Sequence, residues 1–173
     1  HVDSDLNQVH KILQILTEDT AMYKPQSDVN DTNFKNAAYV LFKEKLGISW
    51  SVTEKSCLEA INEICGHIEA GIRMNRQTGL YEMVLFRDDW FDEDEIQTLP
   101  VNKIKSMNLE GATSADELIN KLNVSYYNRE AIKNSSFLVA ENAAIRNLKG
   151  HENADDVKFP YFMNQRNAAI VSQ

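Results

Sequence analysis

The spacing of apolar residues between positions 57 and 87 changes from a helical period to a strand period. In the second part, residues 71–76 and 80–87 are predicted as two strands joined at Gln77-Thr78-Gly79, because Gly79 can adopt the positive φ that a tight hairpin requires. The stretch therefore predicts a helix whose apolar face packs against the hairpin that follows it. The apolar residues of that helix recur three or four positions apart and are Cys57, Leu58, Ile61, Ile64, Cys65 and Ile68.

Two further helices are predicted on the N-terminal side of this unit, separated by a loop over residues 17–29. Asp3 or Ser4 can cap the first helix and Asp31 the second, and Gly47 fits the left-handed position after the second helix ends. The apolar faces consist of Leu6, Val9, Ile12, Leu13 and Leu16 in the first helix, and of Phe34, Ala37, Ala38, Leu41, Phe42 and Leu46 in the second.

The segment that leads into the third helix carries two further local signals. Residues 48–52 alternate between apolar and polar side chains and fit a short strand. Ser51 and Glu54 have the Ser-x-x-Glu spacing of a capping box, which predicts that the third helix begins next to them.

The C-terminal part of the chain is richer in strand patterns. Alternation predicts a long strand over residues 118–127 and a short strand over 136–139. A further strand over 157–163 contains Pro160, which cannot donate a hydrogen bond to a neighbouring strand and therefore favours an edge position. Residues 101–109 fit either a strand or an irregular edge.

Short helices accompany these strands. Residues 140–148 have helical spacing and end at Gly150, and Asn164 can cap a last helix. Because strands and helices mix without a regular β-α-β alternation, we predict an α+β fold. It has a helical part of three helices and a β-hairpin over residues 1–92. A strand-rich part with short helices covers residues 93–173, and we expect it to be truncated at its C-terminal end.

Composition restricts the classes of partner. The chain has 173 residues, of which 43% are hydrophobic, and a formal net charge of −8. This charge disfavours nucleic acid and anionic membranes, because both are bound through Lys and Arg. The sequence has no apolar run of about 20 residues that could span a bilayer. It begins with His1-Val2 rather than Met and stops within an apolar pattern, so we expect an internal fragment of a longer protein.

The sequence predicts no catalytic, cofactor-binding or metal-binding site. The acidic run over residues 88–95 lacks the glycine of an EF-hand loop and is interpreted as a solvated connection. His67 has Glu63 one helical turn before it, but zinc requires at least three protein ligands. Cys57 and Cys65 lie two helical turns apart, about 12 Å at 1.5 Å per residue, which is too far for a disulfide. We therefore predict a non-catalytic protein without cofactor, metal or small-molecule substrate.

Two other functions remain open at this point. Three helices followed by a hairpin is also the order of a winged-helix nucleic-acid-binding module. Its third helix would contact DNA, yet that region carries Glu54, Glu59, Glu63 and Glu69 against the single Lys55, a charge that phosphates repel. A cell-wall hydrolase is the other alternative, although no pair of catalytic carboxylates can be assigned.

The order of several short motifs resembles the phage tail protein family, the tail-tip or baseplate hub proteins of long-tailed phages and prophages. The helix and hairpin of residues 66–90 carry Thr78-Gly79 at the turn and end in Arg87-Asp88-Asp89-Trp90. The alternating run of 117–126, the short helix of 140–150 and the sequence Val157-Lys158-Phe159-Pro160, with Ala168-Ala169 beyond it, follow in the same order. Tyr161-Phe162 and the long acidic run depart from the family pattern.

The resemblance implies a structural role rather than a reaction. It implies a virion component of the tail, made in the cytoplasm of the bacterial host, which acts in virion assembly and host attachment. Its expected partners are other tail or baseplate proteins, and the intact protein is expected to form a homotrimer. The family supplies no catalytic residues to carry over to this sequence.

Overall fold

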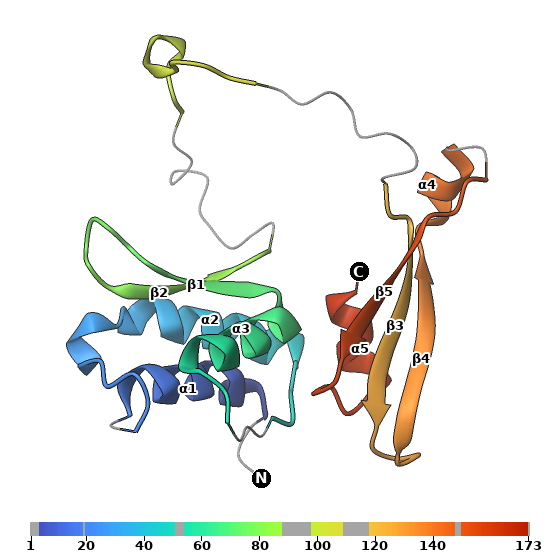
Figure 1. The fold of residues 1–173 in the computed structure, drawn as a ribbon, viewed down its shortest axis with the longest axis horizontal. Helices are drawn as coiled ribbons and strands as arrows, with labels where there is room; N and C mark the ends of the chain where they lie inside the picture. The colour runs from blue at the N-terminus through green and yellow to red at the C-terminus, as the bar shows by residue number, and fades with distance from the viewer. Residues whose placement is uncertain are drawn as a thin grey trace.

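A computed structural model describes residues 4–18, 20–50, 54–87, 98–108, 118–147 and 150–172, with side chains from residue 8 onward (Figure 1). Within these ranges, helices dominate the N-terminal part and strands the C-terminal part, so the predicted α+β class is confirmed. The helices are α1 (Ser4–Thr17), α2 (Asp31–Glu44), α3 (Cys57–Ile68), α4 (Asn142–Asn147) and α5 (Gln165–Val171). The strands are β1 (Ala70–Met74), β2 (Tyr81–Leu85), β3 (Lys121–Asn128), β4 (Lys133–Ala140) and β5 (Ala154–Phe159), and short 3-10 helices are η1 (Gln26–Asp28) and η3 (Val101–Lys103).

Helix α2 has the predicted apolar face but different ends. Asn30, not Asp31, is the N-cap: its side chain accepts a hydrogen bond from the Asn33 backbone N–H. Asn30 also donates its own backbone N–H to Tyr81 of β2, so contact with the hairpin places the cap one residue earlier than predicted. At the other end, Lys45 rather than Gly47 takes the left-handed conformation, with φ of 55°.

The position of this C-cap follows from burial. Leu46 is completely buried although it lies outside the helix, whereas Lys45 is exposed. If the helix ended at Gly47, Leu46 would still be part of the helix. Because the helix ends at Lys45 instead, the chain changes direction there and the Leu46 side chain points into the core. Phe42, which was predicted to face inward, is 52% exposed.

Helix α3 begins one residue after Ser56, which forms a capping box with Glu59. The predicted box of Ser51 and Glu54 is therefore wrong: Ser51 lies outside the described residues, and Glu54 precedes the helix with a φ of 65°. Both pairs share the Ser-x-x-Glu spacing, but only Ser56 directly precedes the apolar periodic run that forms the helix.

The predicted apolar face of α3 is confirmed over the last two turns of the helix. Ile61, Ile64, Cys65 and Ile68 are buried, whereas Leu58 is 63% exposed, which contradicts the prediction that it packs inward. Cys57 and Glu59 also lie outside the core. The first residues of α3 therefore extend past the edge of the core. The helical spacing of apolar residues located the helix correctly but predicted a longer buried face than the structure has.

The hairpin of β1 and β2 forms as predicted, with Gly79 at a φ of +73° in its turn. The outer edge of β2 is bonded to the side chain of Asn33 in α2. Asn33 Oδ1 accepts from the Met83 N–H at 2.7 Å, and its Nδ2 donates to the Met83 carbonyl at 2.9 Å. An amide side chain thus replaces a neighbouring strand, which satisfies backbone groups that a sheet edge otherwise leaves unpaired.

The second sheet has the strand order β4-β3-β5, antiparallel between β3 and β4 and parallel between β3 and β5. Strand β5 lies at an edge, as predicted. It ends at Phe159, however, so Pro160 follows the strand instead of lying within it, and the predicted extension to residue 163 is wrong. Asn164 caps α5 as predicted, and α5 lies on the side of the sheet that faces the helices (Figure 1). Residues 101–108 contain η3 and no strand, and all of them are exposed.

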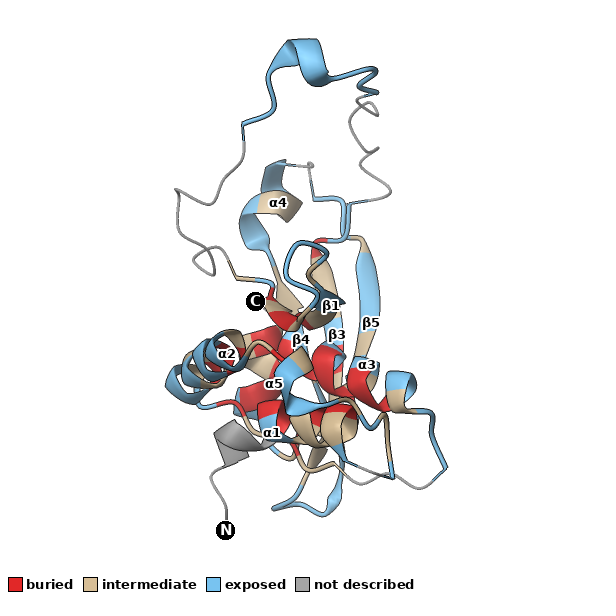
Figure 2. Cartoon of the chain, turned by 90° about the vertical axis from the view of Figure 1, so that its left-hand side faces the viewer, coloured by how far each residue is buried: buried red, intermediate tan, exposed pale blue. Residues whose placement is uncertain are grey.

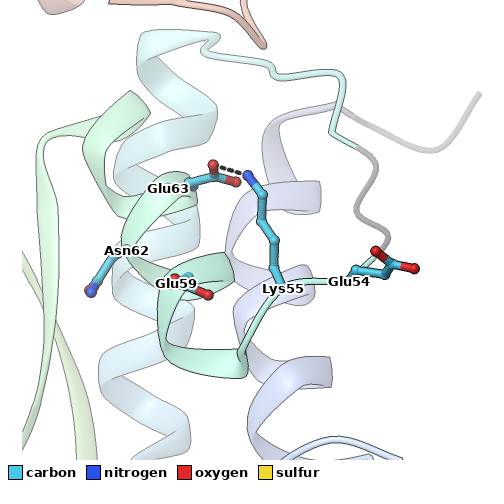
Figure 3. A pocket seen from close by; sticks show the side chains of 5 residues that line it. All are labelled: Glu54, Lys55, Glu59, Asn62 and Glu63. Carbon is cyan, nitrogen blue, oxygen red and sulfur yellow. Dashed lines mark hydrogen bonds and ion pairs between the residues drawn. The ribbon is translucent and has the colours of Figure 1, made fainter.

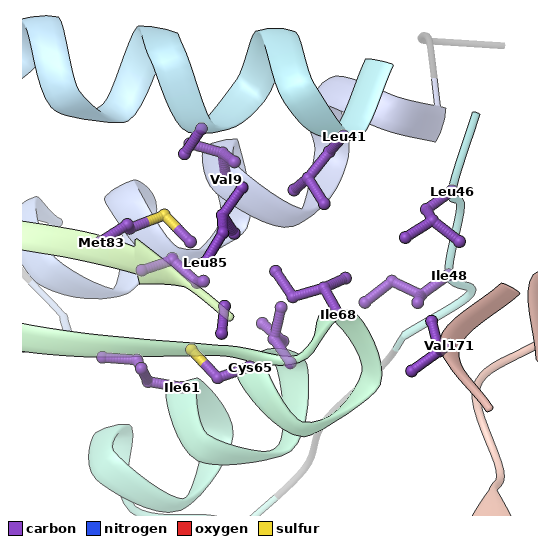
Figure 4. Packing of buried hydrophobic residues seen from close by; sticks show 14 of the residues in the cluster. Val9, Leu41, Leu46, Ile48, Ile61, Cys65, Ile68, Met83, Leu85 and Val171 are labelled. Carbon is purple, nitrogen blue, oxygen red and sulfur yellow. The ribbon is translucent and has the colours of Figure 1, made fainter. Parts of the chain in front are cut away.

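One buried cluster contains side chains from both parts of the chain. Val171 of α5 lies beside Leu46 and Ile48 (Figure 4). Residues 48–50 form no strand, contrary to the prediction, because this segment bonds to the C-terminal part instead: the Ser49 N–H donates to the Tyr161 carbonyl at 2.9 Å. The proposed division at residue 92 falls within 88–97, outside the described residues, and stays a prediction.

The core position of α3 predicts a large difference between two of its apolar residues. Ile64→Ala should lower the free energy of unfolding by about 2–5 kcal/mol, because it removes a fully buried side chain and leaves a cavity. Leu58→Ala on the same helix should change it by less than about 0.5 kcal/mol, since Leu58 is exposed. Urea denaturation followed by circular dichroism measures both, and equal losses would show that the assigned helix face is wrong.

Candidate functional site

A hollow lined by polar and charged residues lies at the start of α3. It has a volume of about 500 Å³ and is lined by Glu54, Lys55, Glu59, Asn62 and Glu63. Figure 3 shows the Lys55 and Glu63 side chains meeting, while Glu54 points away from them. Three carboxylates around one ammonium make the hollow acidic. We therefore expect it to exclude phosphates and other anions.

Glu63 is the most connected of these carboxylates. Lys55 donates to it, and the Tyr161 hydroxyl and Trp50 Nε1 donate to its Oε2 at 3.2 and 3.4 Å. The hydrogen bond from Lys55 is the main reason that the pKa of Glu63 lies below its usual value, and the same contact raises the pKa of Lys55. A carboxylate held ionised in this way is a poor general acid or base at neutral pH.

Glu59 in the same hollow is also engaged locally. Its side chain accepts hydrogen bonds from the backbone N–H and the hydroxyl of Ser56, and the backbone contact is the main reason that its pKa is lowered. Glu59 thus contributes to helix capping. The two carboxylates of α3 that line the hollow are both used to hold structure.

His67 lies one turn beyond Glu63 and is 6% exposed. Its Nδ1 is 2.7 Å from the Glu63 carbonyl oxygen, and its Nε2 accepts the Tyr161 backbone N–H at 3.2 Å. The ring also contacts the rings of Phe159, Tyr161 and Phe162, with centroid distances of 5.0–5.8 Å. The sequence placed Glu63 one turn before His67, a spacing typical of a surface side-chain pair. The ring is instead buried, and it contacts the Glu63 backbone rather than its carboxylate. Its second partner, Tyr161, is 94 residues away and was not predicted.

The two cysteines are free. Cys65 is buried, and burial raises the pKa of its thiol to about 11, so the thiolate that nucleophilic chemistry needs is scarce at neutral pH. Cys57, which was expected to be buried as well, is only half-buried.

Two further polar clusters are structural contacts that the sequence did not reveal. Glu82 is 7% exposed and accepts hydrogen bonds from Asn30 and Asn75 at 3.0 and 3.1 Å. Burial raises the pKa of Glu82, but these bonds and the charge of Arg73 outweigh it, so the pKa is lowered. Asn120 sits at a second hollow of about 450 Å³, where it binds backbone groups of residues 151 and 153.

Arg87, the first residue of the Arg-Asp-Asp motif, joins three elements. Its Nε and one terminal nitrogen donate to the two carboxylate oxygens of Glu44 at 2.7 and 2.9 Å. The same terminal nitrogen donates to the Ile68 carbonyl at 3.1 Å. The end of β2 is therefore fixed to the C-terminal ends of α2 and α3. Residues 88–90 of the motif and the acidic run up to 95 lie outside the described residues.

The most unusual surface among the described ranges is the segment 98–108. All eleven residues are exposed, and Leu99, Val101 and Met107 expose 66%, 84% and 70% of their surface. The segment also holds Lys103 and Lys105 and no acidic residue, in a chain whose net charge is −8. Figure 2 shows it apart from the buried residues of the helices. Sequence reasoning interpreted these apolar positions as a strand or sheet edge and did not identify the exposed surface.

The described parts of the chain contain neither a metal-ligating cluster nor a membrane-spanning helix. There, no group of three or more His, Cys, Asp or Glu side chains could hold a metal ion. No described helix is both long enough and apolar enough to cross a bilayer. No protein-family model matches the chain, and no curated protein matches it either.

The Arg87 contacts predict a measurable stability difference. Arg87→Ala should lower the free energy of unfolding by about 1.5–3 kcal/mol, because Glu44 would lose a charged, two-point hydrogen-bond partner in a mostly buried site. Lys35→Ala is the matched control: its pair with Asp31 is solvent-exposed and should contribute no more than about 0.5 kcal/mol. Thermal and urea unfolding of both variants test this, and similar effects would contradict the assigned role of Arg87.

Proposed function

We propose that this chain is a non-catalytic structural component of a phage or prophage tail, at the tail tip or baseplate hub. The observation that carries the proposal is the exposed segment 98–108, which presents apolar and basic side chains between two well-packed parts. Contiguous exposed apolar residues of this kind are typical of surfaces that bind other proteins. The motif order that resembles the phage tail family gives this assembly surface a specific context.

The electrostatics support a partner that is acidic, including further copies of this chain. Segment 98–108 is positively charged, whereas the rest of the chain carries a larger negative charge. A copy that binds this segment with its acidic surface would gain both apolar burial and charge complementarity. In a tail hub, closed cyclic symmetry would repeat this contact around the axis, with a different surface on each side of the interface. We therefore propose a homotrimer for the protein in the virion.

Light scattering of the intact protein tests the assembly, and we expect a trimer. An intact protein that stays monomeric at high concentration, or that forms a closed dimer, would contradict the hub proposal.

The role of segment 98–108 is tested by placing a charge in it. Val101→Asp should weaken association roughly tenfold to a hundredfold, because burial of a valine contributes about 1.5–3 kcal/mol. Ile132→Asp is the control, since Ile132 is similarly exposed, at 78% against 84% for Val101, but lies in the turn between β3 and β4. Sedimentation equilibrium measures the association constants. Equal weakening by both variants would argue against this segment as the interface.

A winged-helix module is an alternative function that can be tested directly. It is favoured by the element order, in which α1, α2 and α3 are followed by the β1–β2 hairpin. Glu59 of α3 and Glu69, which caps its C-terminal end, are exposed. We therefore expect no DNA binding tighter than micromolar at low salt, where phosphate contacts are strongest. Fluorescence anisotropy with duplex DNA measures it. Submicromolar binding that weakens with salt would favour the winged-helix function over the tail function.

A further inference from the structure

The buried ring of His67 connects two segments that are far apart in the sequence. His67 lies in the last turn of α3, and the segment that contacts it, residues 159–162, joins β5 to α5. The Ser49 N–H also donates to the Tyr161 carbonyl, so the backbone of Tyr161 is bonded on both sides. This junction holds the strand-rich part against the helices.

The partners of the ring fix its protonation state by their chemistry. The Glu63 backbone carbonyl can only accept a hydrogen bond, so Nδ1 of His67 must carry a proton and donate it. The Tyr161 backbone N–H can only donate, so Nε2 must be bare and accept it. Both bonds are therefore made only by the neutral imidazole in one tautomer.

Protonation of Nε2 would break this arrangement. The new N–H would face the Tyr161 N–H across 3.2 Å, and two donors cannot form a hydrogen bond. The rings of Phe159 and Phe162, whose centroids lie 5.8 and 5.3 Å from that of the imidazole, offer no acceptor of comparable strength. The charged ring and the Tyr161 amide must then separate so that water can solvate both.

The charged groups around the ring come from two elements. Glu63 of α3 lies one turn before His67, and Lys55, from the segment before α3, is paired with Glu63. The segment 159–162 contributes only the Tyr161 hydroxyl, which is bonded to Glu63. Burial lowers the pKa of His67, while the hydrogen bond to the Glu63 carbonyl and the Glu63 charge act in the opposite direction.

We propose that His67 and the Tyr161 amide form an acid-released latch between α3 and the β5–α5 connection. This inference concerns the fold itself and does not depend on the proposed tail function. The latch is closed while His67 is neutral and opens when the ring takes up a second proton, which frees the 159–162 segment from the helices.

The direction of the pH dependence follows from linkage. The pKa of His67 in the folded protein lies below the value of about 6.5 for an unfolded chain. The latch therefore contributes its full stability above about pH 6.5 and loses it as the pH falls through the folded pKa. In this window, each pH unit should shift the opening equilibrium by up to about tenfold.

Hydrogen exchange of the Tyr161 amide in the whole chain tests the proposal. It should be measured at about pH 7.5 and 5.5, above the usual carboxyl range of about 3.9–4.3, and corrected for the intrinsic exchange rate. We expect opening to increase by up to about tenfold at the lower pH. His67→Gln, which keeps an acceptor near the Nε2 position but does not titrate there, should abolish this dependence. His10→Gln should retain it, because His10 is exposed on α1.

Unchanged protection of Tyr161 in the parent protein across this range would overturn the latch, as would an equal pH dependence in His67→Gln. If that variant does not fold, NMR titration of the parent protein decides the question. The His67 ring and the Tyr161 amide should then titrate together below about pH 6.5. Titration of the ring without any change at the Tyr161 amide would equally overturn the proposal.

Discussion

Helix α3 is the element on which the rest of the structure depends, because it is packed on two neighbouring sides by different partners. Its apolar side, with Ile61, Ile64 and Ile68, belongs to the core that the hairpin and the other N-terminal helices share. Its polar side, with Glu63 and His67, binds Tyr161 from the C-terminal part. A single helix thus orders the hairpin through hydrophobic burial and the strand-rich part through directional hydrogen bonds. The second kind of contact is the more sensitive to conditions, since it requires particular protonation states.

Short-range patterns predicted the elements well and their ends less well. The helical period located α3, and Gly79 located the hairpin turn, because both signals depend on residues within a few positions of each other. The same local rule admitted two capping boxes, at Ser51–Glu54 and Ser56–Glu59, and only the second is formed. Leu58 shows the limit of periodicity: it has the right spacing, but the core ends before it. The end of a buried helix face depends on how far the elements packed against it extend. A local sequence pattern holds no information about that extent.

Long-range polar contacts could not be predicted from the sequence. Asn33 replaces a strand at the edge of β2, 50 residues away, and His67 pairs with Tyr161, 94 residues away. Asn and His side chains are common on helices, and their partners here are backbone groups, which leave no trace in residue types. The sequence therefore suggests no role for the polar residues of α3. Their role becomes visible only from their contacts in the structure. In the sequence, Tyr161 differs from the motif pattern of phage tail proteins and carries no other signal. In the structure, its backbone N–H binds His67 and its hydroxyl binds Glu63.

Glu63 controls the protonation of His67 at this junction, and its backbone carbonyl and its side-chain carboxylate have different effects. Its backbone carbonyl accepts from Nδ1 and so fixes the tautomer in which Nε2 binds Tyr161. Its carboxylate, kept ionised by Lys55, favours the charged ring and so raises the pKa that burial lowers. Loss of that carboxylate, as in Glu63→Gln, would therefore move release of the latch to lower pH while it also removed the charged partner of Lys55. Glu63 thus orients the neutral ring through its backbone and, through its carboxylate, sets how low the pH must fall before the ring is protonated. The acidic hollow around Glu63 therefore contributes to the contact between the helical and the strand-rich parts of the fold.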